Sequence, residues 1–172
     1  WALIHRESEY GITWHQMTQE ADTGEILEQL KFGLADDETS LSLNTRCFAA
    51  ALDSFATVIE RLEDGTLRGQ PQDLAQRTYF SRHQKPHGLG CLDFLRNTAA
   101  DLEALVRALH FGPYENPLAT AKWVTPLGAV NVVSATAHND PDGESSERPG
   151  QVLAISETEI LVGTAEGLLA IS

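Results

Sequence analysis

One aspartate in a tight turn is the residue of this sequence best placed to do chemistry. Asp22 lies in the run Ala21-Asp22-Thr23-Gly24, which follows an extended stretch rich in β-branched and aromatic residues at 10–17. Ligands bind at the carboxyl ends of strands in open α/β sheets, where a carboxylate can orient an imidazole or hold a proton. The Asp22 side chain could equally accept backbone hydrogen bonds in an Asx turn, so both interpretations stay open.

The histidines and cysteines do not have the spacing of a metal site. His83 and His87 are four residues apart, but a proline between them excludes the helix interior that would turn both rings to one side. His15 lies in the first extended stretch without the further ligands that zinc requires. Cys47 and Cys91 fit neither a zinc site nor a disulfide framework. We therefore expect no resident metal and a reducing environment.

Aromatic and basic residues outside the predicted helices are candidates for a substrate cleft. Tyr79 and Arg82 lie in a long polar segment at 66–93 that shows no clear periodicity. Tyr114 follows the second predicted helix, close to Asn116-Pro117. These side chains could line a substrate cleft, or they could anchor a loop on the core and form a hinge between domains.

Two helices and several strands must position these residues. The apolar spacing predicts one helix from about Ser40 to Glu63 and a second from about Asn97 to Leu109, opened by a capping box between Thr98 and Asp101. The first helix carries one apolar stripe that we expect to be buried, formed by Phe48, Leu52, Phe55, Ile59 and Leu62.

The character of the chain changes after residue 117. Strands are predicted at 10–17 and 25–32 before this point, and at 128–134, 151–155, 159–162 and 168–171 after it, with a polar loop at 138–149. We therefore expect an α/β part at 1–117 and a small antiparallel barrel or sheet at 118–172.

Charge and hydropathy exclude some classes of protein. The 172 residues carry a formal net charge of -13 and a pI of about 4.7, which argues against a nucleic-acid-binding protein because phosphate binding needs clustered cations. No apolar run is long enough to span a bilayer, and the expected location is cytoplasmic. The sequence begins at Trp1 rather than at a methionine, so we expect it to be part of a longer protein.

Several segments together resemble a known enzyme family. Tyr10–Met17 followed by Ala21–Leu27 looks like the second half of the formyltransferase domain that uses 10-formyltetrahydrofolate, and Arg107–Tyr114 with Asn116-Pro117 is similar to the end of that domain. Pro149–Ile155 resembles the start of the C-terminal β-barrel domain of methionyl-tRNA formyltransferases. The implied fold is the C-terminal part of a Rossmann-like α/β formyltransferase domain, followed by a small OB-like antiparallel β-barrel subdomain.

The resemblance also implies roles for individual residues. Asp22 matches the family's catalytic aspartate, whereas the catalytic asparagine and histidine belong upstream of Trp1. The chain alone is therefore expected to be inactive. Thr18, Gln19, Glu20 and Ala21 match the loop that contacts the pterin of the folate, largely through its backbone. The co-substrate implied is 10-formyltetrahydrofolate.

The formyl acceptor implied is an amine other than that of an aminoacyl-tRNA. Residues 116–172 contain two basic and seven acidic residues, which disfavours the acceptor stem of tRNA. The sequences of Ile12–His15 and of Gly112–Pro117 resemble those of formyltransferase domains of peptide synthetases. A small or carrier-tethered amine is favoured, with a sugar-nucleotide amine as its close competitor.

A second class of function stays open beside the enzyme. The chain could be a formyltransferase-like binding or docking module without catalysis. In either case, association with a larger synthetase, or with a second copy through an exposed strand edge, is expected.

Overall fold

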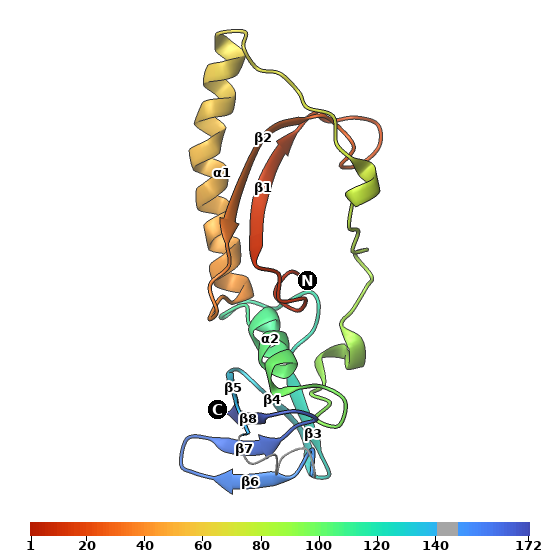
Figure 1. Cartoon of the computed structure of the whole chain (residues 1–172), viewed down its shortest axis with the longest axis vertical. Coiled ribbons are helices and arrows are strands. Elements are labelled where there is room, and N and C mark those ends of the chain that lie inside the picture. The colour runs from red at the N-terminus through yellow and green to blue at the C-terminus, as the bar shows by residue number, and fades with distance from the viewer. Residues whose placement is uncertain (141–147) are drawn as a thin grey trace. The chain divides into compact units, whose positions relative to one another are not determined.

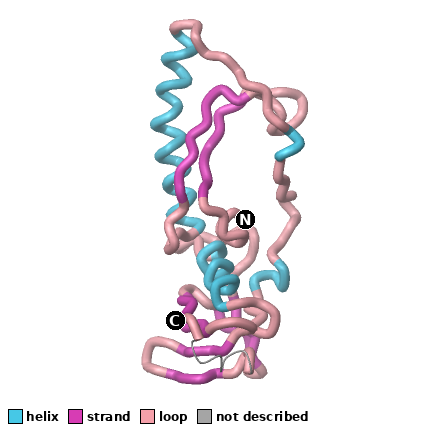
Figure 2. The backbone as a smooth tube through the Cα atoms, in the orientation of Figure 1, coloured by secondary structure: helices cyan, strands magenta, loops and turns pink. Residues whose placement is uncertain are grey.

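The computed structural model of the protein describes residues 1–140 and 148–172, which form two compact units (Figures 1 and 2). The hairpin unit comprises Glu7–Asp36 and Ser42–Ser81, and the sheet unit comprises Trp1–Arg6, Asp37–Leu41 and Arg82–Ser172. The domain boundary near residue 117 stays a prediction. The polar loop expected at 138–149 lies largely outside the described residues.

Two antiparallel strands form the centre of the hairpin unit. β1 (Glu9–His15) pairs with β2 (Ile26–Gly33) along its whole length, with an irregularity between Trp14 and His15. β1 ends two residues earlier than the sequence pattern indicates. The reason is that the chain leaves the strand at Gln16 to enter the connecting loop, whose ends are closed by a backbone hydrogen bond.

A long helix packs on this hairpin. α1 (Ser40–Glu63) has the predicted bounds. The indole Nε1 of Trp14 donates a hydrogen bond to Ser54 Oγ at 3.0 Å, and its ring centroid lies 5.1 Å from that of Phe55. Gly65 follows the helix end and has a φ of 70°. Glycine adopts this left-handed conformation without steric cost, because it has no Cβ atom.

The expected burial of the α1 stripe is wrong for the described chain. Phe48, Leu52 and Leu62 are 65%, 74% and 62% exposed. The helix instead buries a neighbouring face, where Ser54 accepts the hydrogen bond from Trp14, and the stripe residue Phe55 contacts the same Trp14 ring at its border. The buried residues of α1 are Leu43, Ala50, Ser54 and Val58.

The second helix forms as the capping pattern predicts. α2 (Ala99–Leu109) begins after Thr98, whose side chain accepts from the backbone N–H of Asp101 while the Asp101 carboxylate accepts from the Thr98 backbone. Both interactions satisfy backbone donors that a helix start leaves unpaired. The segment at 66–93 is otherwise irregular, apart from short 3₁₀ turns at Leu74–Gln76 and His87–Gly90.

The core of the sheet unit lies between α2 and a four-stranded antiparallel sheet. The strand order is β5-β8-β7-β6, and α2 packs against β5 and β8 (Figure 1). Leu102 and Val106 of α2 meet Val162 and Leu169 of the sheet, and all four side chains are fully buried. The strands are β5 (Ala135–His138), β6 (Val152–Ile155), β7 (Ile160–Gly163) and β8 (Leu168–Ile171).

The sheet unit also contains a two-stranded sheet that shares no strand pairing with the four-stranded sheet. β3 (Lys122–Thr125) and β4 (Gly128–Asn131) pair with each other, so the described strands of the sheet unit form two open sheets and not a closed barrel. β3 and β5 are strands that the sequence pattern missed. β4 ends before the predicted 134 because Val132 turns into the core and donates its N–H to the Ala121 carbonyl.

Burial predicts very different costs for removing two leucines. We expect Leu102→Ala to lower the free energy of unfolding of this chain by about 2 to 5 kcal/mol, since it opens a cavity under α2. The matched change Leu62→Ala, in the exposed stripe, should alter it by no more than about 0.5 kcal/mol. Urea unfolding of both variants measures the difference, and equal losses would contradict the burial described.

Candidate active site

The loop that joins β1 to β2 holds Asp22, and one close backbone approach closes it. The N–H of Gln16 donates to the Glu25 carbonyl at 3.0 Å. Beside this bond, a Cβ atom on Gly24 would overlap the Gln16 carbonyl oxygen. Any other residue at position 24 would therefore push the two sides of the loop apart.

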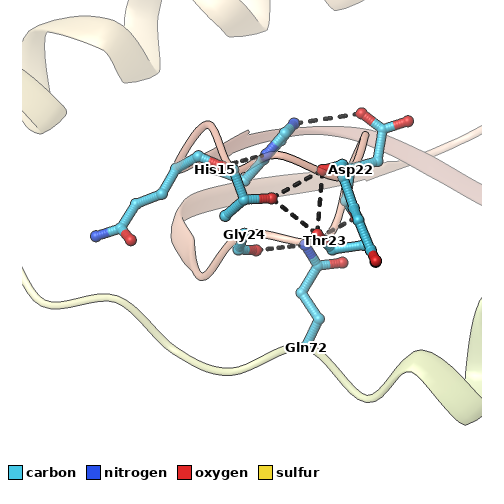
Figure 3. Close-up of polar contacts among 8 residues, drawn as sticks. His15, Asp22, Thr23, Gly24 and Gln72 are labelled. Atoms are coloured by element: carbon cyan, nitrogen blue, oxygen red, sulfur yellow. Dashed lines mark hydrogen bonds and ion pairs between the residues drawn. The ribbon is translucent and has the colours of Figure 1, made fainter.

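Two threonine hydroxyls and one carbonyl stiffen the interior of the loop. Thr18 Oγ1 and Thr23 Oγ1 lie 2.8 Å apart, and they lie 2.8 and 3.1 Å from the Glu20 carbonyl oxygen (Figure 3). Each hydroxyl has a single proton, so at any moment two of these three contacts are hydrogen bonds. The Thr18 side chain is thereby turned inward.

The backbone of Asp22 is held in an unusual conformation. Its φ is 58°, in the left-handed region that aspartate tolerates better than most residues but still at a cost. Gln72 reaches across from the segment after α1, and its Nε2 donates to the carbonyls of Asp22, at 3.3 Å, and Gly24 (Figure 3). The carboxylate itself stays 73% exposed, which leaves it accessible to a ligand or to another segment of protein.

His15, the last residue of β1, faces Asp22. Its Nε2 lies 3.5 Å from Asp22 Oδ1, and its Nδ1 lies 3.0 Å from the Gln16 carbonyl oxygen. A carbonyl oxygen can only accept, so it assigns a proton to Nδ1. The Nε2 contact is attractive when that nitrogen also carries a proton, or when the carboxyl group does. An imidazole nitrogen and a carboxyl oxygen at this separation form an arrangement suited to acid–base chemistry.

The sequence-predicted site residues are divided between the hairpin unit and the sheet unit. Thr18, Gln19, Glu20 and Ala21 are exposed in the same loop as Asp22. Tyr79 is exposed in the hairpin unit with the Arg77 guanidinium 5.4 Å from its ring centroid. Arg82 and Tyr114 are exposed in the sheet unit, where the Tyr114 ring contacts Phe111. The roles assigned to these residues stay predictions.

Sequence reasoning missed two members of this arrangement. The signal for His15 was present, because a polar residue at a strand end faces the loop that follows, but the pairing depends on the path of that loop. Gln72 had no local signal, since it lies 48 residues beyond Gly24. Across residues 1–140 and 148–172, no three His, Cys, Asp or Glu side chains group closely enough to hold a metal ion.

Comparison with known families decides which kind of protein this is. Residues 87–172 match the family model described as formyl transferase, C-terminal domain. The chain belongs to the formyl transferase family. Its match covers α2 and every strand from β3 to β8, which is the part with the well-packed core. No helix in the described part of this family member is long and apolar enough to cross a membrane.

Solved structures with this fold include sugar formyltransferases and a larger protein. The N-formyltransferase from Helicobacter canadensis, in complex with folinic acid and dTDP-3-aminofucose, aligns with a TM-score of 0.71 at 19% identity, covering 99% of this chain and 58% of that one. WlaRD, a sugar 3N-formyl transferase, has a TM-score of 0.71 at 18% identity and covers 99% and 57%. HypX from Aquifex aeolicus with tetrahydrofolic acid gives 0.67 at 19%, covering 99% and 28%. This formyl transferase chain thus spans little more than half the length of these sugar enzymes.

The stabilisation of the loop by the Gln72 hydrogen bonds can be tested without any activity assay. In Gln72→Ala, we expect hydrogen exchange at the Gln16 and Ile26 amides to accelerate about tenfold, because two hydrogen bonds that brace the loop are lost. Gln76→Ala, which removes an exposed contact to Asp73, is the matched control and should leave these amides unchanged. Unaltered exchange in Gln72→Ala would show that the loop does not depend on this contact.

Proposed function

We propose that this chain is the C-terminal part of an enzyme that transfers a formyl group from 10-formyltetrahydrofolate to an amine. The observation that carries the proposal is the pair formed by Asp22 and His15, which places an exposed carboxylate beside an imidazole at the end of a strand. Family membership supports the reaction class, and solved relatives with folinic acid or tetrahydrofolic acid bound support the co-substrate.

The loop at residues 18–21 fits the co-substrate contact that we assign to it. The segment is exposed, and its Thr18 hydroxyl is already engaged with the Glu20 carbonyl and the Thr23 hydroxyl. Backbone N–H and C=O groups match the alternating donors and acceptors of a pterin ring edge. This agrees with a contact that depends little on the identity of the side chains.

In the proposed reaction, the acceptor nitrogen attacks the formyl carbon and the bond from that carbon to N10 of the folate breaks. The acceptor nitrogen loses one proton and N10 gains one, so the products are a formamide and tetrahydrofolate. Asp22 would stabilise a cationic histidine supplied by the upstream part of the enzyme, and that histidine would move the proton. A carboxylate beside an imidazole favours its protonated form.

The exposed stripe of α1 supports the view that an upstream body completes this enzyme. Large apolar side chains exposed in a row along one helix face normally pack against another protein surface. We propose that the Rossmann-like half, with the catalytic asparagine and histidine, covers this stripe. On this proposal the 172-residue chain alone does not transfer formyl groups. We also propose that its C-terminal part corresponds to the OB-like subdomain of the family.

For the acceptor, we propose a small or carrier-tethered amine in preference to tRNA. The strong excess of acidic residues in 116–172 opposes an RNA acceptor. Relatives that act on amino sugars make a sugar-nucleotide amine the principal competitor. Formylation assays with an aminoacyl carrier protein, a dTDP-amino sugar and an aminoacyl-tRNA, offered at equal concentrations, would separate the three.

The decisive experiment replaces Asp22 in the longer enzyme. We expect Asp22→Asn to lower the turnover number about 10²- to 10⁴-fold, as loss of an acid–base group does. The fold should persist, because asparagine tolerates the left-handed backbone of this position. Formyl transfer is followed by the absorbance of tetrahydrofolate, with circular dichroism as the control for folding. A folded variant with normal turnover would contradict the catalytic role of Asp22, whereas no turnover in the unmutated longer protein would favour the non-catalytic docking module.

His15 provides a second and separable prediction. As a positioning residue it should affect the turnover number more than the Michaelis constant for folate. We expect His15→Ala to lower turnover about tenfold, because the Asp22 carboxylate loses the imidazole beside it. His15→Gln, whose amide nitrogen reaches the position of Nε2, should restore part of the activity. Equal losses in both variants would indicate a purely structural residue.

A further inference from the structure

The sheet unit contains a cavity that the proposed reaction does not use. Its volume is about 620 Å³, and none of its lining residues belongs to the candidate active site. The apolar part of the wall includes Trp123 and Val132 from the region of β3 and β4, and Ile160 and Ile171 from β7 and β8. The rim is completed by the turn between β6 and β7.

The cavity follows the open edge of β4. All four residues of Gly128–Asn131 line it, although side chains of a strand point alternately to its two faces. Of β3, the alternate residues Trp123 and Thr125 line it, so the cavity lies over one face of the β3–β4 hairpin and reaches the outer edge of β4. Within the described residues β4 has β3 as its strand partner on one side and none on the other, which leaves backbone donors and acceptors available there.

Apolar side chains are concentrated around this edge. Val130 and Ile155 both line the cavity and are 57% and 74% exposed, and Leu127 at the tip of the β3–β4 turn is fully exposed. The turn is held by Thr125, whose Oγ1 donates to the Gly128 carbonyl and accepts from the Leu127 N–H. An unpaired strand edge beside exposed apolar side chains is a surface on which another strand is stabilised.

Two carboxylates set the charge of the rim. Glu157 and Glu159 line the cavity together with no lysine or arginine, and neither has an ion-pair partner in the described part of the chain. Ser156 fixes their positions, because its Oγ accepts from the backbone N–H of Thr158 and of Glu159. An occupant with cations at its ends would meet these two carboxylates.

We propose that the edge of β4 binds an extended segment of another polypeptide as an added strand. The segment runs along Gly128–Asn131 with backbone hydrogen bonds, places alternate apolar side chains in the cavity, and carries lysine or arginine beside Glu157 and Glu159. This inference is independent of the formyl transfer proposed above. It identifies a means by which a strongly acidic chain can be held by a basic linker or tail of a partner protein.

The test uses a defined peptide and the 172-residue chain. A fluorescein-labelled peptide with the sequence Lys-Thr-Val-Thr-Val-Thr-Lys should bind saturably in fluorescence anisotropy, and the same peptide with glutamate at both ends should bind at least about tenfold more weakly. A version with N-methyl groups on alternate residues, which removes the backbone donors of one edge, should also lose binding. Equal binding of all three peptides would overturn the proposal.

Variants of the chain locate the site. Val130→Asp and Ile155→Asp place a charge at the cavity and should abolish binding of the lysine peptide. Val124→Asp and Val133→Asp are matched controls, since these residues are 59% and 63% exposed but do not line the cavity, and both should bind normally. Thermal unfolding of all four variants verifies the fold. Equal effects of cavity and control variants would overturn the assignment.

Charge reversal gives an outcome that misfolding cannot imitate. The double variant Glu157→Lys, Glu159→Lys should prefer the glutamate peptide over the lysine peptide. An unchanged preference would overturn the role of the rim. Sedimentation of the chain without peptide tests the competing occupant: a dimer that the peptide dissociates, and that Val130→Asp abolishes, would assign the edge to a second copy of this chain and overturn the proposal.

Discussion

The close approach of Gly24 to the Gln16 carbonyl is the constraint on which the candidate site depends. It allows the two ends of the β1–β2 connection to meet across a single hydrogen bond, and the loop between them is short enough for Asp22 to return to the strand end where His15 lies. The internal threonine contacts and the Gln72 side chain then remove the remaining freedom. The catalysis proposed for this carboxylate requires such bracing, because small displacements of reacting groups cost large factors in rate.

Features coded by local spacing could be predicted from the sequence. The capping box of Thr98 and Asp101 and the bounds of α1 depend on residues within one or two turns of helix, so the sequence pattern located them. The segments quoted for the family resemblance were specific for the same reason, since turn residues such as Gly24 and Gly112 mark fixed points of the backbone. Two short strands were missed because Lys122–Thr125 and Ala135–His138 contain few aliphatic residues. The equally short strands β6, β7 and β8 are almost wholly aliphatic and were predicted.

Features that depend on tertiary neighbours could not be predicted. The spacing of Phe48, Leu52 and Leu62 specifies a helix with one apolar face, but it does not say which protein surface covers that face. The His15–Asp22 contact likewise requires knowledge of the loop path, and the help of Gln72 requires knowledge of a segment nearly fifty residues away. Pairing of strands into two open sheets in place of a barrel is a property of the whole unit and of no single strand.

The left-handed backbone of Asp22 has an evolutionary consequence. A non-glycine residue with a φ of 58° costs the folded chain on the order of 1 kcal/mol that a glycine would avoid. Random mutation under selection for stability alone would therefore drift toward glycine at this position. On the proposed function, the aspartate at this position sacrifices some stability of the fold for the chemistry of its carboxylate.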